Sequence, residues 1–213
     1  MKKYFTLFLL ALFVQVGFAQ DEDVEKRDDM NTIFNKENLK FTGGYLAPEI
    51  KVGNVHEDIS LLMGGKLGFT FNRNFSFGIA GYGLVNNSNY TIERTPGIPE
   101  SASIGLGYGG LSLEYTLFSK KVVHFTVPVI IGVGGVYLYE DNGDFFNNSW
   151  NEIENSAAMV VEPGVNLELN LFKFFRLDLG ASYRYVTGTS LLYLNDEDLT
   201  DLCFNATFKF GFF

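Results

Sequence analysis

Residues 175–186 of this 213-residue chain read FRLDLGASYRYV, and apolar and polar side chains alternate along them with a period of two. In an extended strand, such alternation places the two kinds of side chain on opposite faces. Aromatic residues stand at both ends of the apolar face, as they do on strands that cross an outer membrane with that face toward lipid. The apolar face would carry Phe175, Leu177, Leu179, Ala181, Tyr183 and Tyr185, and the other face Arg176, Asp178, Gly180, Ser182, Arg184 and Val186.

The length of this stretch also fits a membrane-crossing strand. Ten residue steps separate Phe175 from Tyr185. At about 3.3 Å per residue and a tilt near 40°, they span roughly 25 Å, the height of the apolar band of an outer-membrane barrel. We therefore expect the aromatic residues of this strand to lie in the two girdles at the membrane surfaces.

Alternation of the same kind from Leu39 onward predicts eight β-strands. Tight turns at 72–74, 119–121 and 172–173 alternate with long polar loops at 86–102, 140–156 and 188–200, and only the first connection, around His56, is short where a long one is expected. This pattern is typical of bacterial outer-membrane barrels. The sequence thus predicts an all-β fold, a single eight-stranded antiparallel up-and-down transmembrane β-barrel, with strands at about 39–54, 59–71, 75–85, 103–118, 122–139, 157–171, 174–187 and 201–213.

The strand expected at 103–118 changes phase along its length. Its apolar residues are even-numbered over 104–108 and odd-numbered over 111–117. A β-bulge inserts one extra residue into a strand, and glycines often mark such a site. We therefore expect a bulge at Gly109-Gly110.

The amino terminus has the pattern of an export signal. Lys2 and Lys3 precede about fifteen apolar residues, and the small-x-small pattern around Ala19 predicts cleavage there. The chain is therefore expected to consist of a signal peptide (1–19), an acidic periplasmic leader (20–38) and a barrel domain (39–213). Because Cys203 is the only cysteine, neither an internal disulfide nor acylation at the cleavage site is available.

The composition favours a membrane barrel over a nucleic-acid-binding protein. The chain contains 22 Phe, 11 Tyr and 23 Gly, a bias toward aromatic and turn residues that suits girdled β-strands. Its net charge is -9, and it becomes -11 when the two signal-peptide lysines are removed. Nucleic-acid phosphates would repel such a protein.

The chain resembles the small outer-membrane β-barrel proteins of Bacteroidetes-type bacteria, a family mostly without assigned activity. The resemblance rests on Phe18-Ala19-Gln20, Met63-Gly64-Gly65, Gly81-Tyr82-Gly83-Leu84 and the segment 198–213, which ends in Phe210-Gly211-Phe212-Phe213. Phe213 departs from the family pattern, because it is out of phase with the outward row that ends at Phe212. The resemblance implies location in the outer membrane, contact with its lipid and lipopolysaccharide, and recognition by the insertion machinery.

The inward face of the predicted barrel holds as many acids as bases. An eight-stranded barrel is just wide enough for side chains to fill its interior, so buried charges must form pairs. We expect an interior ion-pair network that plugs the lumen, although a gated pore or a small-ligand site is an open alternative. The network residues are Lys66, Glu114, Glu162, Glu168, Arg176, Asp178, Arg184 and Lys209.

No motif predicts a catalytic, cofactor or metal site. His124 shares the inward face with Thr126, which resembles the His-x-Ser placement of barrel lipid A deacylases, but the pair lies near a tight turn and faces the lumen. His56 has no neighbouring Ser. The acidic stretches 140–144 and 195–201 do not match the spacing of a calcium-binding loop.

The predicted loop 140–156 carries four large apolar side chains, Phe145, Phe146, Trp150 and Ile153. Exposed aromatics mark contacts with protein or glycan, but they can also pack across a barrel mouth or at the lipid surface. We expect a non-enzymatic protein with a structural or adhesive role through its loops. The alternatives are a narrow channel, an outer-membrane lipid-modifying enzyme, and a soluble lipocalin-like periplasmic barrel that encloses a lipophilic ligand.

Overall fold

The computed structural model describes residues 40–56, 58–86, 88–95, 98–140 and 152–213, and nearly all of them lie in β-strands. No helix in these residues is long and apolar enough to cross a membrane. The elements are β1 (Phe41–Val55), β2 (Asp58–Phe71), β3 (Phe75–Leu84), β4 (Ser88–Thr95), β5 (Ile98–Leu117), β6 (Val123–Glu140), β7 (Glu152–Phe172), β8 (Phe175–Thr187), α2 (Asp196–Leu199) and β9 (Asp201–Gly211).

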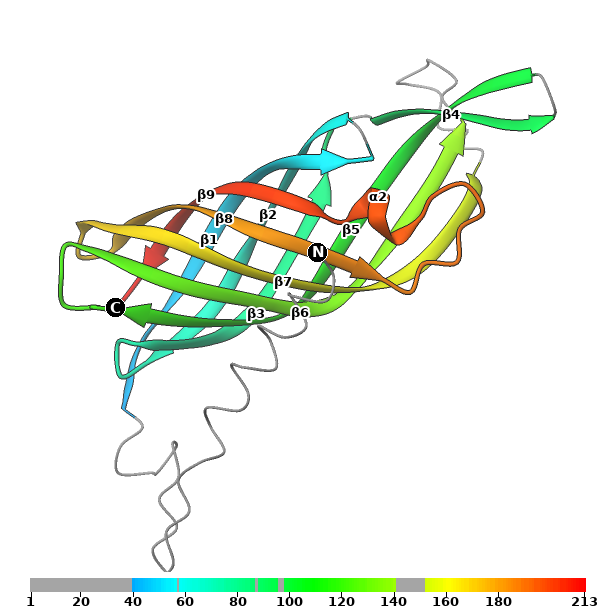
Figure 1. Ribbon diagram of the computed structural model, residues 1–213. Helices are drawn as coiled ribbons and strands as arrows, with labels where there is room; N and C mark the ends of the chain where they lie inside the picture. The colour runs from blue at the N-terminus through cyan, green and yellow to red at the C-terminus, as the bar shows by residue number, and fades with distance from the viewer. Residues whose placement is uncertain (1–39, 57, 87, 96–97, 141–151) are drawn as a thin grey trace, which may run out of the picture. The chain divides into compact units, whose positions relative to one another are not determined.

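Eight of the strands close into a ring (Figure 1). The order is β3-β2-β1-β9-β8-β7-β6-β5, and pairing between β3 and β5 completes the circle. Every neighbouring pair is antiparallel. The predicted eight-stranded antiparallel up-and-down barrel is confirmed.

The connections differ between the two ends of the ring. At one end, which we call the turn end, residues 72–74, 118–122 and 173–174 make short turns. Asn72 and Arg73 both have positive φ, 54° and 63°, and the Asn74 amide donates to the Phe71 carbonyl. Two such residues make a type I′ turn, whose twist matches that of the flanking strands. We call the opposite end the loop end.

The loop predicted at 86–102 is wrong, because much of it is a β-hairpin. Residues 88–95 form β4, which pairs with the first residues of β5 and extends beyond the ring (Figure 1). β5 and β7 accordingly begin at Ile98 and Glu152, five residues before their predicted starts at 103 and 157. These extensions contain many polar residues, so they lack the apolar alternation that marks the rest of the barrel.

The bulge predicted at Gly109-Gly110 is also wrong. The pairing of β5 with β3 and with β6 continues through both glycines without a shift. Even-numbered residues of β5 therefore face the lumen along the whole ring, and these include Ile104, Leu106 and Tyr108, which are all buried. The apolar phase changes because the inward residues of β5 are apolar at 104–108 and polar or charged at 112–116.

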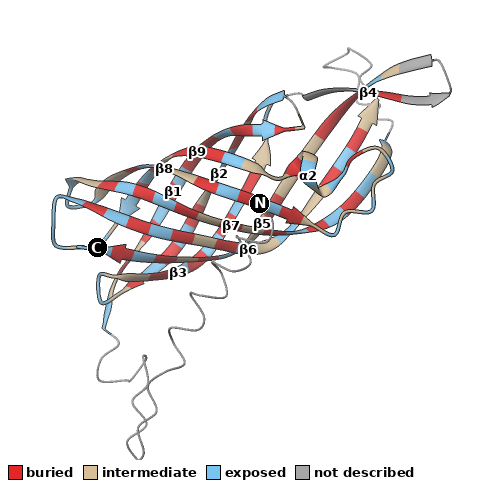
Figure 2. Ribbon diagram, in the orientation of Figure 1, coloured by how far each residue is buried: buried red, intermediate tan, exposed pale blue. Residues whose placement is uncertain are grey.

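Side chains alternate between the lumen and the outer surface along the ring strands (Figure 2). On β8, Asp178 and Arg184 are fully buried, whereas Leu179 and Tyr185 are exposed. The lipocalin-like alternative requires the apolar rows inside the barrel, but the structure places them outside. Exposed members of these rows include Leu46, Ile50, Leu67, Phe69, Phe77, Ile79, Leu111, Phe125, Ile131, Val165, Leu167, Leu179, Phe204 and Phe210.

Candidate functional site

The lumen near the turn end contains a cluster of charges centred on Lys209. Its ammonium nitrogen lies 2.6 Å from Glu114 Oε1, 2.5 Å from Glu168 Oε2 and 2.8 Å from Asp178 Oδ2. All four side chains are almost completely buried. One cation therefore holds three carboxylates, which come from β5, β7 and β8, against a lysine of β9.

The second oxygen of Glu168 connects two more side chains to this cluster. It accepts a hydrogen bond from Arg176 Nη1 at 2.7 Å and lies 2.6 Å from His124 Nε2. His124 Nδ1 lies 3.1 Å from the Lys121 carbonyl oxygen. Both ring nitrogens of His124 thus face acceptor oxygens, which fix the orientation of the ring. We call these six residues the turn-side cluster: Glu114, His124, Glu168, Arg176, Asp178 and Lys209.

A second set of charges, the middle cluster, consists of Glu49, Lys51, Lys66 and Glu162. Lys51 Nζ lies 2.6 Å from Glu162 Oε1 and 3.4 Å from Glu49 Oε1, and Lys66 Nζ lies 2.7 Å from Glu49 Oε2. Two acids therefore balance two bases. The four side chains are buried to the same degree as those of the turn-side cluster.

Neutral side chains complete the middle cluster. Tyr108 Oη donates to Glu162 Oε2 at 2.6 Å, and the Ser182 hydroxyl donates to Glu162 Oε1 at 2.5 Å. The Lys51 ammonium lies 3.5 Å from the centre of the Tyr82 ring. Burying a charge is costly unless it is paired and hydrogen-bonded, and these contacts meet that requirement.

The void inside the middle cluster is small. Its volume is about 10 Å³, which is room for about one water molecule. The Asn166 amide nitrogen beside it has no hydrogen-bond partner among the described residues, while the Asn205 amide donates to Asn166 Oδ1 at 3.1 Å. At this level the lumen is thus filled by protein rather than open to a solute.

The structure brings together seven of the eight residues predicted for the interior network, and it adds three, Glu49, Lys51 and His124. Arg184 forms no ion pair among the described residues: it donates to the carbonyl oxygens of Leu199, at 2.8 Å, and Asn54, at 2.6 Å. It lies closer to the loop end than Glu168 of β7 and Asp178 of β8. Glu49 and Lys51 were missed, although the period-two alternation of 45–55 places both on the inward face of that strand.

The loop-end half of the lumen is mostly apolar, with Arg184 as a buried charge held by backbone carbonyls, which corrects the expectation that ion pairs plug the whole barrel. We call its buried residues the apolar plug. Leu194 and Leu199, from the segment between β8 and β9, are buried in it and cover the barrel mouth. The plug comprises Val55, Leu62, Ala80, Tyr82, Ile92, Ala102, Ile104, Leu106, Tyr108, Ile130, Val136, Leu138, Ala158, Val160, Val186, Leu194 and Leu199.

The covering segment is held to the barrel by hydrogen bonds. The His56 amide, in a residue with φ of 57°, donates to the Asp198 carbonyl at 2.5 Å. The Asp196 carboxylate accepts hydrogen bonds from the amides of Gly188 at 3.1 Å and Thr189 at 3.0 Å. Partial burial raises the pKa of Asp196. The hydrogen bonds from Thr189 and Gly188 lower it by more, so the pKa of Asp196 lies below its usual range.

The four predicted loop contacts do not form a described site. Phe145, Phe146 and Trp150 lie outside the described residues. Ile153 lies in β7 and packs, partly buried, against the apolar plug. The register shifts between Leu138 and Tyr139, so Ile153 is an extra residue in its strand rather than part of a loop.

The contacts of His124 do not suit a general base. Its Nε2 faces Glu168 and its Nδ1 faces the Lys121 carbonyl, while the buried Thr126 hydroxyl has no hydrogen-bond partner in the described part of the chain. Within the described ranges, no group of three or more His, Cys, Asp or Glu side chains is arranged to hold a metal ion. The arrangement can therefore support rigidity of the barrel.

Small outer-membrane barrels of known structure are similar to this chain over most of its length. The outer membrane protein OprG from Pseudomonas aeruginosa matches with a TM-score of 0.52 at 11% identity, over 81% of this chain and 97% of that one. The N-terminal β-barrel domain of Pseudomonas aeruginosa OprF matches with a TM-score of 0.47 at 10% identity, over 81% of this chain and 100% of that one. Ail, the attachment invasion locus protein of Yersinia pestis, matches with a TM-score of 0.46 at 11% identity, over 81% of this chain and 99% of that one.

No protein-family model matches the chain, and no curated protein matches it. At these identities the structural similarities concern the fold alone, and the similarity to OprG agrees with the eight-stranded ring. The resemblance to Bacteroidetes-type barrels stays a prediction.

Proposed function

We propose that this protein spans an outer membrane as a non-enzymatic barrel and presents its loop end, outside the cell, as a structural or adhesive surface. Both chain ends would then lie on the periplasmic side. Export by the signal peptide at 1–19, insertion by the outer-membrane machinery, contact with lipopolysaccharide, and an extracellular protein or glycan partner belong to the same proposal. The fold of OprG, a protein of the outer membrane, agrees with this location.

One observation carries the membrane assignment: the same strands have an apolar outer face and an ion-paired inner face. Leu46, Leu67 and Ile79 each expose more than half of their surface on the outside, while Lys66 and Lys209 are buried inside. Leaving a large apolar side chain in water rather than burying it costs about 1.5–3 kcal/mol. A lipid environment removes that cost for the whole outer face.

The filled lumen supports a static surface rather than a conduit. The middle cluster leaves room for about one water molecule, and the apolar plug lies between it and the loop end. The hairpin of β4 and β5 extends beyond the ring at that end (Figure 1), where it is available to a partner.

The first experiment tests the membrane barrel by cell fractionation and by gel migration before and after boiling. We expect the protein in the outer-membrane fraction and a shift in migration on boiling, because a closed barrel resists detergent until it is heated. A soluble periplasmic protein with no shift would contradict the proposal.

The orientation is tested with epitope tags. A tag inserted between Thr95, the last residue of β4, and Ile98, the first residue of β5, should bind antibody on intact cells. The matched control is the same tag at 120–121, in a tight turn, which should bind antibody only after the outer membrane is permeabilised. The opposite result would show that the loop end faces the periplasm.

Planar-bilayer recording distinguishes the surface role from the narrow-channel alternative. We expect no steady conductance, because ion pairs and apolar side chains fill the lumen. A reproducible conductance from the purified barrel would contradict the surface role and support the channel.

A further inference from the structure

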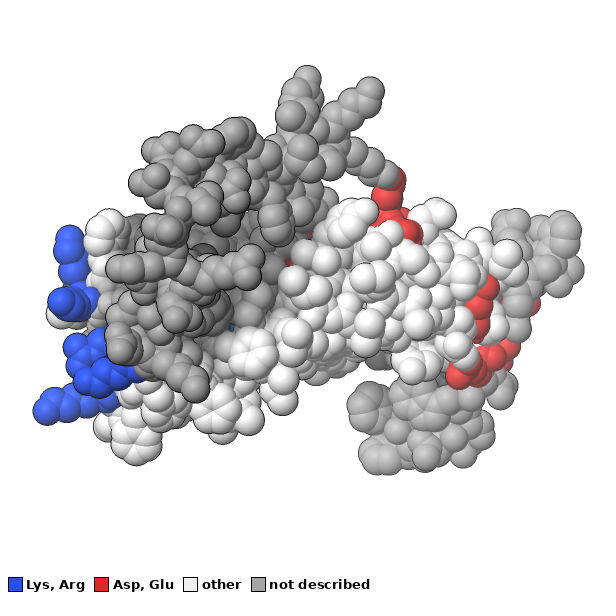
Figure 3. Space-filling view, turned by 90° about the horizontal axis from the view of Figure 1, so that it is seen from below, with Lys and Arg blue, Asp and Glu red and all other residues white. Residues whose placement is uncertain are grey.

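The exposed charges of the barrel are separated between its two ends (Figure 3). Among the side chains whose burial the structure describes, which exclude Glu93 and Arg94 of β4, the exposed cations lie at the turn end, and the acidic side chains outside the lumen clusters lie at the loop end. The outward positions of the ring strands between them carry no charged residue. The cations are Lys40, Arg73, Lys120, Lys121 and Lys173, and the acids are Asp58, Glu100, Glu140, Glu152, Glu154, Asp196, Glu197, Asp198 and Asp201.

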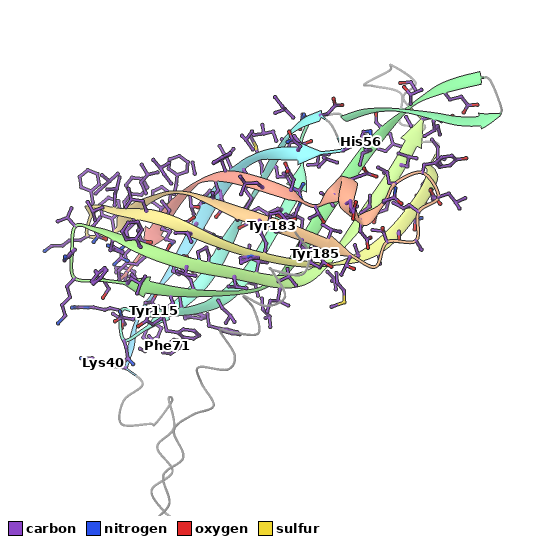
Figure 4. The ribbon with its side chains drawn as sticks, in the orientation of Figure 1. Lys40, His56, Phe71, Tyr115, Tyr183 and Tyr185 are labelled. Carbon is purple, nitrogen blue, oxygen red and sulfur yellow. The ribbon has the colours of Figure 1, made fainter. Side chains whose placement is uncertain are left out.

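The cations at the turn end lie directly beside exposed aromatic rings. Lys173 follows Phe172 and precedes Phe174, whose rings stack at 5.7 Å and are 63% and 59% exposed. Lys121 Nζ lies 5.1 Å from the centre of the Phe118 ring. Figure 4 shows Lys40 at the same end of the barrel as Phe71 and Tyr115. A rim with apolar rings and ammonium groups at one level suits the boundary between acyl chains and headgroups.

The five turn-end cations stand apart from the acidic side chains of the described residues. Within the part of the chain that the structure describes, none of the five forms an ion pair. The carboxylates nearest to the turn end, including Glu168 and Asp178, already bind Lys209 within the lumen. Cations without an ion-pair partner among the described residues create a positive potential that attracts a surface of negative charge.

We propose that the turn end binds the anionic headgroups of phospholipids in the leaflet at that end. This inference rests on the proposed function, because it requires the barrel to span a bilayer. The ligand is a phospholipid rather than lipopolysaccharide, whose phosphates belong to the leaflet at the acidic loop end. A basic side chain near an anionic membrane surface strengthens binding by about fivefold.

The test measures lipid selectivity at the protein surface by spin-label electron paramagnetic resonance. The full-length protein is reconstituted in phosphatidylcholine vesicles, and spin-labelled phosphatidylglycerol is compared with spin-labelled phosphatidylcholine. We expect a preference for phosphatidylglycerol of about fivefold at low salt, which declines as salt screens the charges. Replacing three turn-end lysines by glutamine should remove most of this preference: Lys120→Gln, Lys121→Gln and Lys173→Gln.

A matched variant with arginine at the same three positions should keep the preference, because it conserves the charge. The heat-dependent gel shift of every variant reports whether its barrel is folded. Equal affinity for the two lipids in the unaltered protein, or an unchanged preference in the glutamine variant, would overturn the inference while leaving the membrane barrel intact. Failure of the unaltered protein to insert into vesicles would overturn both proposals.

Discussion

The turn-end half of the lumen is filled by paired charges, whereas the loop-end half is filled by apolar side chains. A single strand, β5, contributes to both: Glu114 binds Lys209 in the turn-side cluster, and Ile104 is buried in the apolar plug. The outer face of the same strand is leucine-rich beside the charged half and changes to glycine beside the apolar half. The backbone and its pairing are continuous across this change.

The two halves place different demands on the sequence. In the charged half each side chain requires a particular partner, because removing one member of a buried pair leaves its partner uncompensated. In the apolar half, shape and volume decide the packing, and substitutions of similar volume are tolerated best. We therefore expect the free energy of unfolding to fall most when a charge is removed in the charged half, and when side-chain volume is removed in the apolar half.

Replacing Lys209 by Met should produce the largest effect. The change leaves Glu114, Glu168 and Asp178 facing one another without their shared cation. Loss of one partner of a buried ion pair costs about 3–5 kcal/mol. Urea unfolding of the barrel in vesicles measures this change. The control is Lys173→Met, an exposed residue whose replacement should change the free energy of unfolding by no more than about 0.5 kcal/mol; equal effects of the two changes would contradict the prediction.

Replacing Leu62 by Ala should lower the free energy of unfolding by about 2–5 kcal/mol. Leu62 is completely buried in the apolar plug, so the change leaves a cavity that the neighbouring strands cannot close. Leu67→Ala on the outer face of the same strand is the matched control, and it should cost less because lipid can occupy the vacated volume. Urea unfolding again provides the measurement, and a larger loss at Leu67 would show that the plug packs loosely.

Replacing Tyr108 by Phe should lower the free energy of unfolding by about 1.5–3 kcal/mol, as expected for a hydrogen bond to a charged group. Tyr108 donates to Glu162 at the border between the charged and apolar halves, and its volume hardly changes in this substitution. Tyr185→Phe, on the outer face, should have a smaller effect. If the two changes cost the same, the hydroxyl of Tyr108 does not support the middle cluster.

Loss of the hydrogen bonds that Asp196 accepts should have the smallest effect on stability, and it concerns the segment that covers the apolar half of the lumen. The pKa of Asp196 is lowered, so its stabilising hydrogen bonds are fully present above its unfolded pKa of about 3.9 and are lost as the pH falls through the lower folded value. Hydrogen exchange of the Gly188 and Thr189 amides, corrected for the intrinsic rate, should therefore accelerate in that acidic range. Asp196→Asn should show the faster exchange already at neutral pH; protection that is independent of pH and of this substitution would show that the Asp196 carboxylate does not hold these amides.

The sequence determined the features of this protein that follow from a period of two. The eight ring strands, the outward aliphatic rows and the inward charges of 175–186 could be predicted, because the orientation of a side chain along an extended strand is a local property. The extended ends of β5 and β7 could not be predicted, because polar residues there remove the apolar alternation on which the prediction depends.

The phase of Phe213, which departs from the outward row, is explained by its contacts. Its ring stacks on Tyr45, and the ring centre lies 3.7 Å from the Arg176 guanidinium.

Only the tertiary structure decided which inward residues meet. Lys209 of β9 reaches Glu114 of β5 across the lumen, and Glu49 and Lys51 of β1 complete a cluster whose other members come from β2 and β7. These pairings depend on the stagger between strands around the closed ring, which no single strand encodes. The same stagger places Arg184 beside carbonyl groups instead of a carboxylate, and it separates one continuous lumen into a charged half and an apolar half.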